Sequence, residues 1–339
     1  MKFIRKGELS KKILITDGLP GCGITMLSPI LSSLSRVEMF YFAFEIEFIT
    51  RLFHFNKIKK DSATSLIRML TDYKLYNSMM SREINFRSLD LSSVTRHHNY
   101  KEYINRLKSP GDKTVPRLIK KKKPILHLIT HDILNYSKIL VESLAPRLTY
   151  VELIRHPLDT INQQIYIMED HFNNPRSVQI EFEFKKKPLP YWSNDWKSKF
   201  LKMNNVNRAI FNICKMHNDN SKNRKRLKKI LKENYICVPF EKFTIEPMPI
   251  LKKISKSLNT EITKTTLKEM KKQNIPRKKF FNTPQTEIYK RVGGSLKHVK
   301  DRKKDISRKI NIFKKKGAST KYLDLLAEIS YDYEKKHIL

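Results

Sequence analysis

Four short runs of apolar residues place the tightest constraint on the fold of this chain. Each run is apolar nearly throughout, whereas a strand with one wet face would alternate apolar and polar residues. The runs span residues 12–16, 124–130, 148–154 and 235–239. They predict buried strands that are covered on both faces.

Helical patterns follow two of these runs. After the second run, apolar residues recur at helical spacing at Ile133, Tyr136, Leu140 and Leu144. After the fourth run, Pro249 suits a first helical turn, and a stripe follows at Ile250, Ile254 and Leu258. Because strands alternate with helices, we predict an α/β fold of three layers, in which helices flank a parallel central sheet.

The C-terminal third is predicted to be helical and very basic, with one basic run at residues 300–316. Ser319 or Thr320 can cap a last helix. The apolar face of that helix is predicted at Tyr322, Leu325, Leu326 and Ile329.

No strong linker interrupts the chain, so we expect a single domain over residues 1–339. Residues 57–114 lack a strand pattern and are predicted to form a helical insertion or a mobile lid. The most apolar stretch, residues 37–48, is short and carries three glutamates. It should therefore not span a bilayer, and we predict a buried or partly buried helix there.

The chain is strongly basic, with 69 Lys and Arg against 33 Asp and Glu and a formal net charge of +36. Such an excess attracts anions, among them nucleotide phosphates, acidic glycans, anionic lipids and nucleic acid. A compositional bias toward Lys, Ile and Asn explains the same charge without any anionic partner. Both explanations stay open.

Three cysteines, Cys22, Cys214 and Cys237, are too few and too scattered for a disulfide framework or a zinc site. Residues 1–9 are basic but lack the apolar core of a signal peptide. These two features favour a reducing compartment, and we expect a cytoplasmic protein.

The first apolar run leads into a glycine-rich loop, residues 16–25, and then into a helical pattern that contains Pro29, a residue expected to kink it. Glycines allow tight backbone turns, so several N–H groups can point at one anion near the positive end of a helix. The spacing from Gly18 to Gly23 is that of a P-loop, with Ile24 in place of the usual Lys. The pattern predicts a P-loop-like fold in which the missing Lys disfavours ATP hydrolysis. The alternative is a plain glycine-rich turn.

This loop resembles the first signature of sulfotransferases that use 3′-phosphoadenosine 5′-phosphosulfate (PAPS), Gly-x-Pro-(Arg or Lys)-Ser-Gly-Thr-Thr. In this sequence Gly18, Pro20, Gly23 and Thr25 match, while Gly21, Cys22 and Ile24 replace the basic residue, the Ser and a Thr. The second signature of the family, Arg-x-Pro-x-Asp after a strand, resembles Arg155 to Asp159. A family Ser eight residues after the Arg is replaced by Gln163.

Three further segments resemble the family in the same order along the chain. A strand ends in Thr130-His131, where family members carry Lys-Thr-His. Phe240-Glu241 stands after the fourth apolar run, where the family has Tyr-Glu-Asp-Leu. Arg291 and Gly293 partly match a C-terminal Arg-Lys-Gly signature.

The resemblance implies sulfuryl transfer from PAPS, as co-substrate, to a hydroxyl or amine of an acceptor, with no metal. It implies that His131 is the catalytic base. The loop and Thr25 would hold the 5′ phosphosulfate, Arg155 and Arg291 would hold the 3′ phosphate, and Gln163, Phe240 and Gly293 would complete the nucleotide site. The missing cation at Gly21 leaves catalytic competence open. Another of the many Lys or Arg side chains can take its place, and Lys11, Lys12 and Arg36 are the nearest in sequence.

The acceptor is not readable from the sequence, and a glycan and a small hydroxyl compound are both candidates. An aromatic wall for it, or simply a packed core, is predicted from Tyr166, Tyr191, Trp192 and Trp196. Two other functions compete with sulfuryl transfer. One is another P-loop transferase such as a small-molecule kinase. The other is a non-catalytic protein that binds a nucleotide or a polyanion, among which nucleic acid is less favoured.

Overall fold

The computed structural model describes residues 1–90, 92–111, 113–170, 174–175, 179–280 and 301–338. The chain forms two compact units, each described here by itself. The first unit comprises residues 1–154 and 220–280, and the second comprises residues 155–219 and 281–339.

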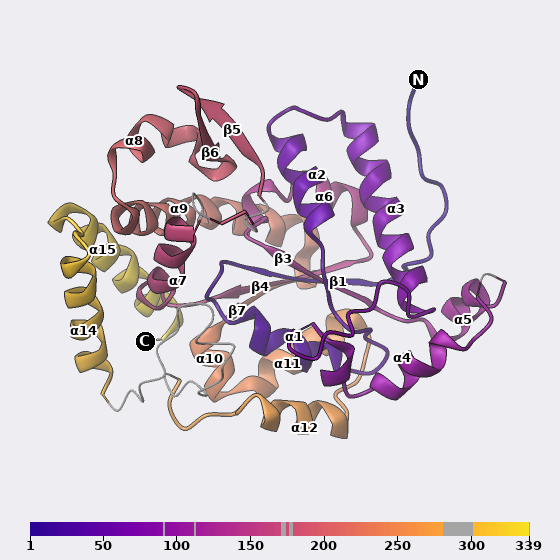
Figure 1. Ribbon diagram of the computed structural model, residues 1–339. Helices are drawn as coiled ribbons and strands as arrows, with labels where there is room; N and C mark the ends of the chain where they lie inside the picture. Colours follow the sequence, from indigo (N-terminus) through magenta and orange to yellow (C-terminus); the bar gives the residue numbers. More distant parts are fainter. Residues whose placement is uncertain (91, 112, 171–173, 176–178, 281–300, 339) are drawn as a thin grey trace. The chain divides into compact units, whose positions relative to one another are not determined.

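A five-stranded parallel sheet forms the centre of the first unit (Figure 1). Its strands lie in the order β2 (Tyr41–Phe42), β3 (Leu126–His131), β1 (Ile13–Gly18), β4 (Leu148–Ile154) and β7 (Tyr235–Pro239). All four strand pairs are parallel. The α/β fold predicted from the sequence, with a parallel central sheet flanked by helices, is therefore confirmed.

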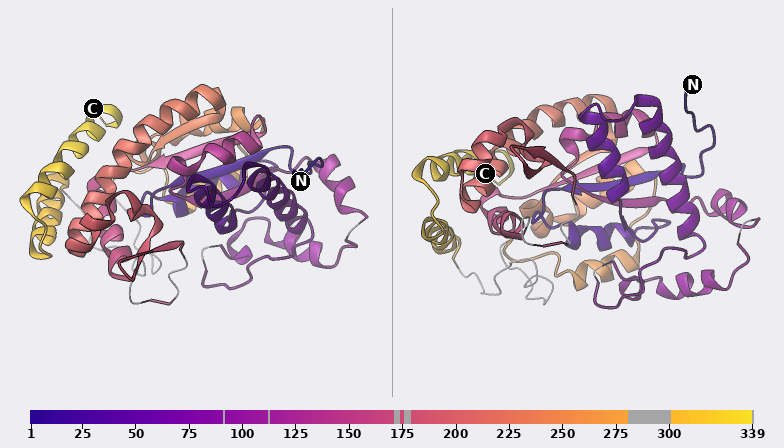
Figure 2. Two further views of the ribbon diagram at one scale, coloured as in Figure 1. Left: turned by 90° about the horizontal axis from the view of Figure 1, so that it is seen from above. Right: turned by 45° about the horizontal axis from the view of Figure 1, so that its top comes forward.

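Side chains on alternate positions of the strands feed two hydrophobic clusters, one on each face of the sheet. Ile13 and Ile15 of β1 belong to one cluster, and Leu14 belongs to the other. The first cluster is completed by α2 (Phe44–His54), α3 (Lys60–Ser78), α5 (Val115–Lys122) and α6 (Lys138–Leu144). The second is completed by α1 (Ile24–Ser32), α10 (Phe240–Ile245), α11 (Pro247–Leu258) and α12 (Lys264–Lys272). Figures 1 and 2 show these two helical layers around the sheet.

The predicted strands match the observed ones closely. β4 and β7 begin and end at the predicted residues. β1 begins one residue and ends two residues later than predicted, and β3 begins two residues and ends one residue later. The helix expected from Ile133 onward is interrupted, because a 3₁₀ turn, η2 (Leu134–Tyr136), precedes α6.

The prediction of one helix over residues 37–48 is wrong. The stretch divides at Ala43 into strand β2 and helix α2. Tyr41 and Phe42 are held in the sheet by pairing with Leu128 and Ile129 of β3, a long-range contact that local periodicity does not reveal.

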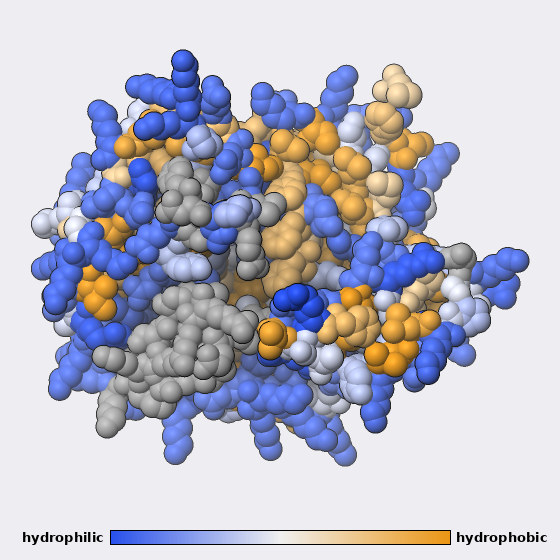
Figure 3. Space-filling model, in the orientation of Figure 1, coloured by the Kyte–Doolittle hydropathy of each residue, from blue (hydrophilic) through white to orange (hydrophobic). Residues whose placement is uncertain are grey.

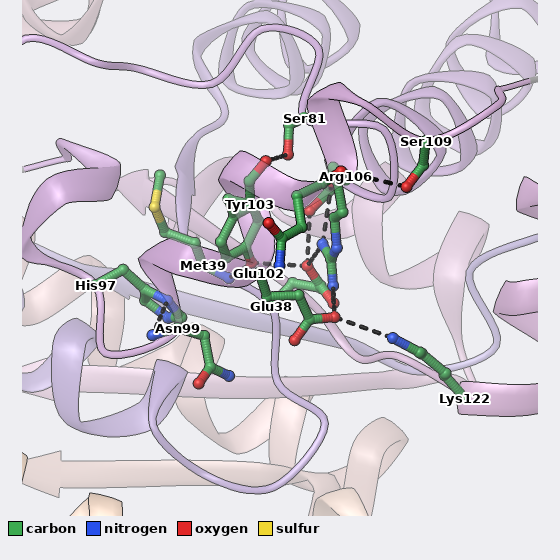
Figure 4. A network of polar contacts seen from close by, with 12 residues as sticks. Glu38, Met39, Ser81, His97, Asn99, Glu102, Tyr103, Arg106, Ser109 and Lys122 are labelled. Carbon is green, nitrogen blue, oxygen red and sulfur yellow. Dashed lines mark hydrogen bonds and ion pairs between the residues drawn. The ribbon is translucent and has the colours of Figure 1, made fainter.

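Residues 57–114 contain α3, η1 (Val94–Arg96) and α4 (Tyr100–Leu107). A buried carboxylate ties them to the rest of the first unit (Figure 4). Glu38 Oε2 accepts hydrogen bonds from Arg106 Nη1 at 2.7 Å, Tyr103 Oη at 2.7 Å and Ser78 Oγ at 2.8 Å. Such buried contacts favour a docked insertion over a hinged lid.

The second unit contains α7 (Pro157–Asp170), a hairpin of β5 (Glu181–Phe184) and β6 (Lys187–Pro190), η3 (Tyr191–Trp196) and α8 (Lys197–Lys202). It also contains α14 (Arg302–Lys315) and α15 (Thr320–His337), and α9 (Asn205–Leu231) begins in it and ends in the first unit. None of the helices in the described residues is both long enough and apolar enough to cross a membrane.

The last helix begins at Thr320 with Ser319 as its cap residue, as predicted, but its buried face differs. The buried residues are Leu323, Leu326, Ile329 and Tyr333. Tyr322 and Leu325 are only half-buried. Tyr322 lies at the rim of the face, where its ring packs edge-on against Phe211.

Candidate functional site

The glycine-rich loop joins β1 to α1 in the first unit, and its backbone requires glycine. Gly21 and Gly23 have φ angles of 93° and 104°, in the left-handed region that other residues rarely adopt. A Cβ on Gly18 would lie 2.5 Å from the Leu153 carbonyl oxygen, and one on Gly23 would lie 2.7 Å from the Phe240 ring. The tight turn predicted from the sequence is therefore present.

The loop offers backbone groups, and one side chain, to a ligand. Cys22 and Ile24 are 1% and 6% exposed and pack into the hydrophobic cluster beneath the loop. Thr25 is exposed. Ile24 and Thr25 lie in the first turn of α1, where helix geometry leaves N–H groups without an acceptor four residues earlier. No acidic residue stands in that turn, so the end of the helix keeps its partial positive charge.

Phe240 supports the loop. It is the first residue of α10, follows β7 directly and is 3% exposed. Its ring lies so close to Gly23 that no side chain fits between them. Phe240 was predicted to bind the nucleotide. In the structure it packs against Gly23 and so supports the shape of the loop.

His131, the predicted base, ends β3 beside the loop. In the register of the sheet His131 is the direct partner of Gly18, the last residue of β1. The next N–H, that of Asp132, donates to the Gly18 carbonyl oxygen at 3.2 Å. The carboxyl ends of parallel strands are where α/β proteins bind their ligands, so the loop and the histidine share one binding edge.

The surroundings of His131 come from β2 and α2. Glu47 Oε1 accepts hydrogen bonds from the His131 backbone N–H at 2.8 Å and from its Nδ1 at 2.9 Å. The rings of Phe42 and Phe44 lie nearly parallel to the imidazole, each with its centroid 5.7 Å away. Phe44 is 47% exposed, and hydrophobic residues gather over α2 on the face shown in Figure 3.

Sequence reasoning missed Glu47 and its neighbour Arg51. Arg51 Nη2 donates to the His131 carbonyl oxygen at 2.9 Å and forms an ion pair with Glu47 at 3.0 Å. The sequence carries one signal of the pair, an acid and an Arg four residues apart, which face each other on a helix. That signal was hidden because α2 was not recognised as a separate helix.

Two buried aspartates lie below the binding edge. Asp17 accepts hydrogen bonds from Tyr150 Oη at 2.6 Å, Thr130 Oγ1 at 2.9 Å and the Ile133 N–H at 3.2 Å, and burial raises its pKa to about 6. Burial also raises the pKa of Asp132 well above its usual value, and nearby Asp17 adds to the rise. Within the described ranges, no three His, Cys, Asp or Glu residues are arranged to hold a metal ion.

The second signature lies at the start of the second unit. Arg155 and Gln163 are half-buried, and Asp159 stands between them in the first turn of α7. Asp159 forms ion pairs with Arg302 at 2.9 Å and with Lys309, both from α14. Burial alone would raise the pKa of Asp159, but Lys309, Arg302 and Arg155 hold it well below its usual value.

The remaining predicted residues are placed as follows. Arg291 and Gly293 lie outside the described residues. The aromatic side chains of the proposed acceptor wall are mostly packed together in the second unit. Tyr191 and Trp196 are buried, and the rings of Trp192 and Trp196 lie 5.8 Å apart. Tyr166, on α7, is 42% exposed.

The cations nearest to the loop in sequence do not lie near it in space. Lys11 and Lys12 precede β1, a strand of six residues or about 20 Å, whereas the loop follows it. Arg36 donates to the carbonyl oxygens of Lys123 and Asn259, next to the start of β3. A replacement for the basic residue missing at Gly21 would therefore have to come from another of the chain's Lys or Arg side chains.

Three of the similar solved structures are sulfotransferases or sulfotransferase domains. The sulfotransferase domain from the Synechococcus PCC 7002 olefin synthase is 12% identical, with a TM-score of 0.39 over 92% of this chain and 98% of that one. The sulfotransferase domain from the curacin biosynthetic pathway is 13% identical, with a TM-score of 0.43 over 90% and 99%. Sulfotransferase STF9 from Mycobacterium avium is 11% identical, with a TM-score of 0.40 over 91% and 76%. No family model and no curated protein matches the sequence. At these identities and scores, the roles of individual residues rest on this chain's own geometry.

Proposed function

We propose that this protein transfers a sulfuryl group from PAPS to a hydroxyl or amine of an acceptor. One observation carries the proposal. Gly18 ends the strand that leads into the phosphate loop, and it is the direct partner of His131 in the adjacent parallel strand. The ring of His131 is held by a hydrogen bond to Glu47. A transferase needs this combination, because an anion site and a base must lie close enough to act on one substrate.

The residues of the loop suit the phosphosulfate end of the nucleotide. The N–H groups of Ile24 and Thr25, the Thr25 hydroxyl and the positive end of α1 offer donors to an anion. PAPS, when bound, supplies a sulfuryl group already attached to a phosphate leaving group. We assign its 3′ phosphate to Arg155, whose planar fork donates hydrogen bonds in pairs, with Gln163 in support and Arg291 and Gly293 as further candidates.

His131 would take the proton of the acceptor. Because Nδ1 is engaged with Glu47, Nε2 is the ring nitrogen left to act as base. The leaving group needs a cation that the loop does not supply at Gly21. Ile24 stands where a P-loop carries its lysine, so the loop offers no lysine for ATP chemistry either, and a kinase is the weaker alternative.

Turnover tests this proposal. The purified chain is incubated with PAPS and a panel of phenols, sugars, glycans and amines, and formation of 3′,5′-adenosine bisphosphate is followed by chromatography. We expect acceptor-dependent turnover that falls roughly 10²–10⁴-fold in His131→Ala. Turnover that is unchanged in His131→Ala would remove the histidine from the mechanism. Transfer from ATP but not from PAPS would contradict the proposed function.

A cationic groove on α14 favours a second candidate function, binding of a polyanion without turnover. The groove measures about 520 Å³. Among the described residues it is lined by Lys303, Lys304, Ser307, Arg308, Asn311, Ile312 and Lys315. A heparin titration at several salt concentrations tests it, because each contact with an anionic group steepens the loss of affinity with salt. If the affinity for heparin falls with salt equally steeply in the wild type and in the double variant Lys304→Ala, Lys315→Ala, this groove is excluded as the heparin site.

A further inference from the structure

We propose that Glu47 is a positioning residue that fixes the orientation and the tautomer of the His131 imidazole. The inference rests on the proposed function only in giving His131 the role of a base. The arrangement of the pair stands on contacts within the first unit.

One carboxylate oxygen of Glu47 holds His131 at two points. Oε1 accepts from the backbone N–H at 2.8 Å and from Nδ1 at 2.9 Å. A carboxylate oxygen only accepts hydrogen bonds, so this contact requires a proton on Nδ1. The lone pair of the neutral ring is then on Nε2.

Glu47 is itself held in place. It is 2% exposed, and its second oxygen, Oε2, pairs with Arg51 at 3.0 Å. Arg51 stands one turn later on α2, is 5% exposed and also donates to the His131 carbonyl oxygen. A buried charge with such a partner keeps its place, because moving it would leave both ions unpaired.

The aromatic neighbours limit rotation of the imidazole. The rings of Phe42 and Phe44 make angles of 13° and 11° with the plane of His131. A ring flip would turn Nδ1 away from Glu47 and break the hydrogen bond. The packing therefore fixes the plane of the imidazole, and the carboxylate of Glu47 selects which of the two flipped orientations the ring adopts within that plane.

The proton balance explains what the pair contributes. When the acceptor O–H gives its proton to Nε2, the ring becomes an imidazolium with protons on both nitrogens. The proton on Nδ1 stays where it was, and Glu47 remains a carboxylate facing the new positive charge. The pair thus stabilises the charge that forms on the base, in the manner of the carboxylate in a catalytic triad.

A purely structural role for Glu47 makes a different prediction. If Glu47 only ties α2 to the end of β3, its loss should lower stability and leave the imidazole's tautomer unchanged. Tautomer and stability must therefore be measured together.

Nitrogen NMR of the imidazole tests the inference without any turnover. The ten histidines are labelled with ¹⁵N, and the His131 signals are identified by their loss in His131→Gln. In the wild type we expect the neutral ring to carry its proton on Nδ1. In Glu47→Leu, which leaves no acceptor for the Nδ1–H, we expect this preference to be lost, and kcat to fall roughly 100-fold or more while KM for PAPS changes about twofold or less.

Glu38→Gln is the matched control. Glu38 is also a buried glutamate of the first unit, paired with Arg106 at 2.7 Å, and none of its contacts involves His131. Its substitution should lower stability and leave the His131 tautomer and kcat unchanged. Since Glu47→Leu removes the charged partner of buried Arg51, the double variant Glu47→Leu, Arg51→Met serves if the single variant does not fold.

The outcomes separate this inference from the proposed function. A Glu47→Leu protein that is folded and still carries its proton on Nδ1 overturns the positioning role, whether or not PAPS is used. A lost tautomer preference in a protein that neither binds nor uses PAPS supports the pair and contradicts the proposed function. A tautomer that changes equally in Glu38→Gln would also overturn the inference, because the effect would then be general.

Discussion

Gly23 is the residue on which the shape of the phosphate loop depends most. Its φ of 104° and its approach to Phe240 each exclude a side chain. We expect Gly23→Ala to destabilise the protein by about 1–3 kcal/mol, the usual cost of a strained backbone, and to abolish nucleotide binding.

Gly7→Ala provides the control for this substitution. A Cβ on Gly7 would make ordinary contacts at 3.5 Å with the Arg5 side chain, and the φ of Gly7 is not in the left-handed region. Thermal melting and nucleotide titration of both variants are the measurements. Normal binding by Gly23→Ala would show that the loop does not hold the ligand through its backbone.

The missing cation of the loop also has a physical reason at the residue scale. Gly21 has a φ of 93°, which a lysine or arginine adopts only with strain. We therefore expect Gly21→Lys to lower the melting temperature and to leave turnover with PAPS no higher than in the wild type. A stable Gly21→Lys protein with raised turnover would contradict this reading of the loop.

Asp17 gives a pH dependence that can be isolated by substitution. Its pKa is raised by burial to about 6, so the folded protein holds a proton there that the unfolded chain releases near pH 4. The protonated Asp17 carboxyl therefore contributes to the free energy of unfolding at low pH, and this contribution is lost as the pH rises from about 4 to 6. Relative to Asp17→Asn, the wild type should lose about 3 kcal/mol over that window.

Thermal unfolding of both proteins at several pH values checks this expectation. Other groups titrate in the same window in both proteins, so the difference between the two curves reports Asp17 together with its coupling to nearby Asp132. Parallel curves, or a difference of the opposite sign, would show that Asp17 is not held protonated in the folded protein.

At the scale of single residues, the sequence revealed the ends of strands better than their surroundings. His131 could be singled out because the strand that ends in Thr130-His131 resembles the family's Lys-Thr-His segment, and the structure places it at the carboxyl edge of the sheet. Glu47 could not, since its contact with His131 joins residues 84 positions apart in the chain. The burial of Cys22 and Ile24 was equally hidden, because a loop sequence does not tell which side chains turn inward.

At the scale of elements, α14 is bound to α7 by a buried carboxylate. Asp159 pairs with Arg302 and Lys309, and its side chain is 5% exposed. We expect Asp159→Asn to cost roughly 3–5 kcal/mol, because it leaves buried cations short of a partner. Faster hydrogen exchange of the α14 amides would report the loosened helix.

An exposed ion pair between the same two regions is the control. Lys316 and Glu169 lie 2.9 Å apart with side chains 45% and 48% exposed. Glu169→Gln should change stability by about 0–1 kcal/mol and leave exchange in α14 nearly unchanged. Equal effects of the two substitutions would show that the Asp159 pairs do not anchor the helix.

The elements of the sheet were the most predictable part of the fold. Continuous apolar runs mark strands buried on both faces, and this pattern located β1, β3, β4 and β7. The two-residue strand β2 was missed because its place in the sheet depends on β3. The hairpin of β5 and β6 is buried only at the last two residues of β6, so its sequence carries no continuous apolar run that would mark a strand.

At the scale of the whole molecule, the net charge of +36 bears on affinity for anions in general, and not on which anion is bound. The charge attracts any polyanion, so salt-sensitive binding alone cannot identify the ligand. The proposed function requires a more specific ligand, a nucleotide with phosphates at both its 3′ and its 5′ positions. Discrimination between nucleotides therefore tests the account better than affinity for anions.

The central claim is tested most directly by calorimetric titration of the wild-type chain with 3′,5′-adenosine bisphosphate and with ATP at the same ionic strength. We predict that the bisphosphate binds clearly more tightly, and that Arg155→Ala removes most of this difference while Lys202→Ala, which removes an exposed cation of the second unit, does not. Tighter binding of ATP, or equal binding of both nucleotides, would contradict the assignment of this chain as a PAPS-dependent sulfotransferase.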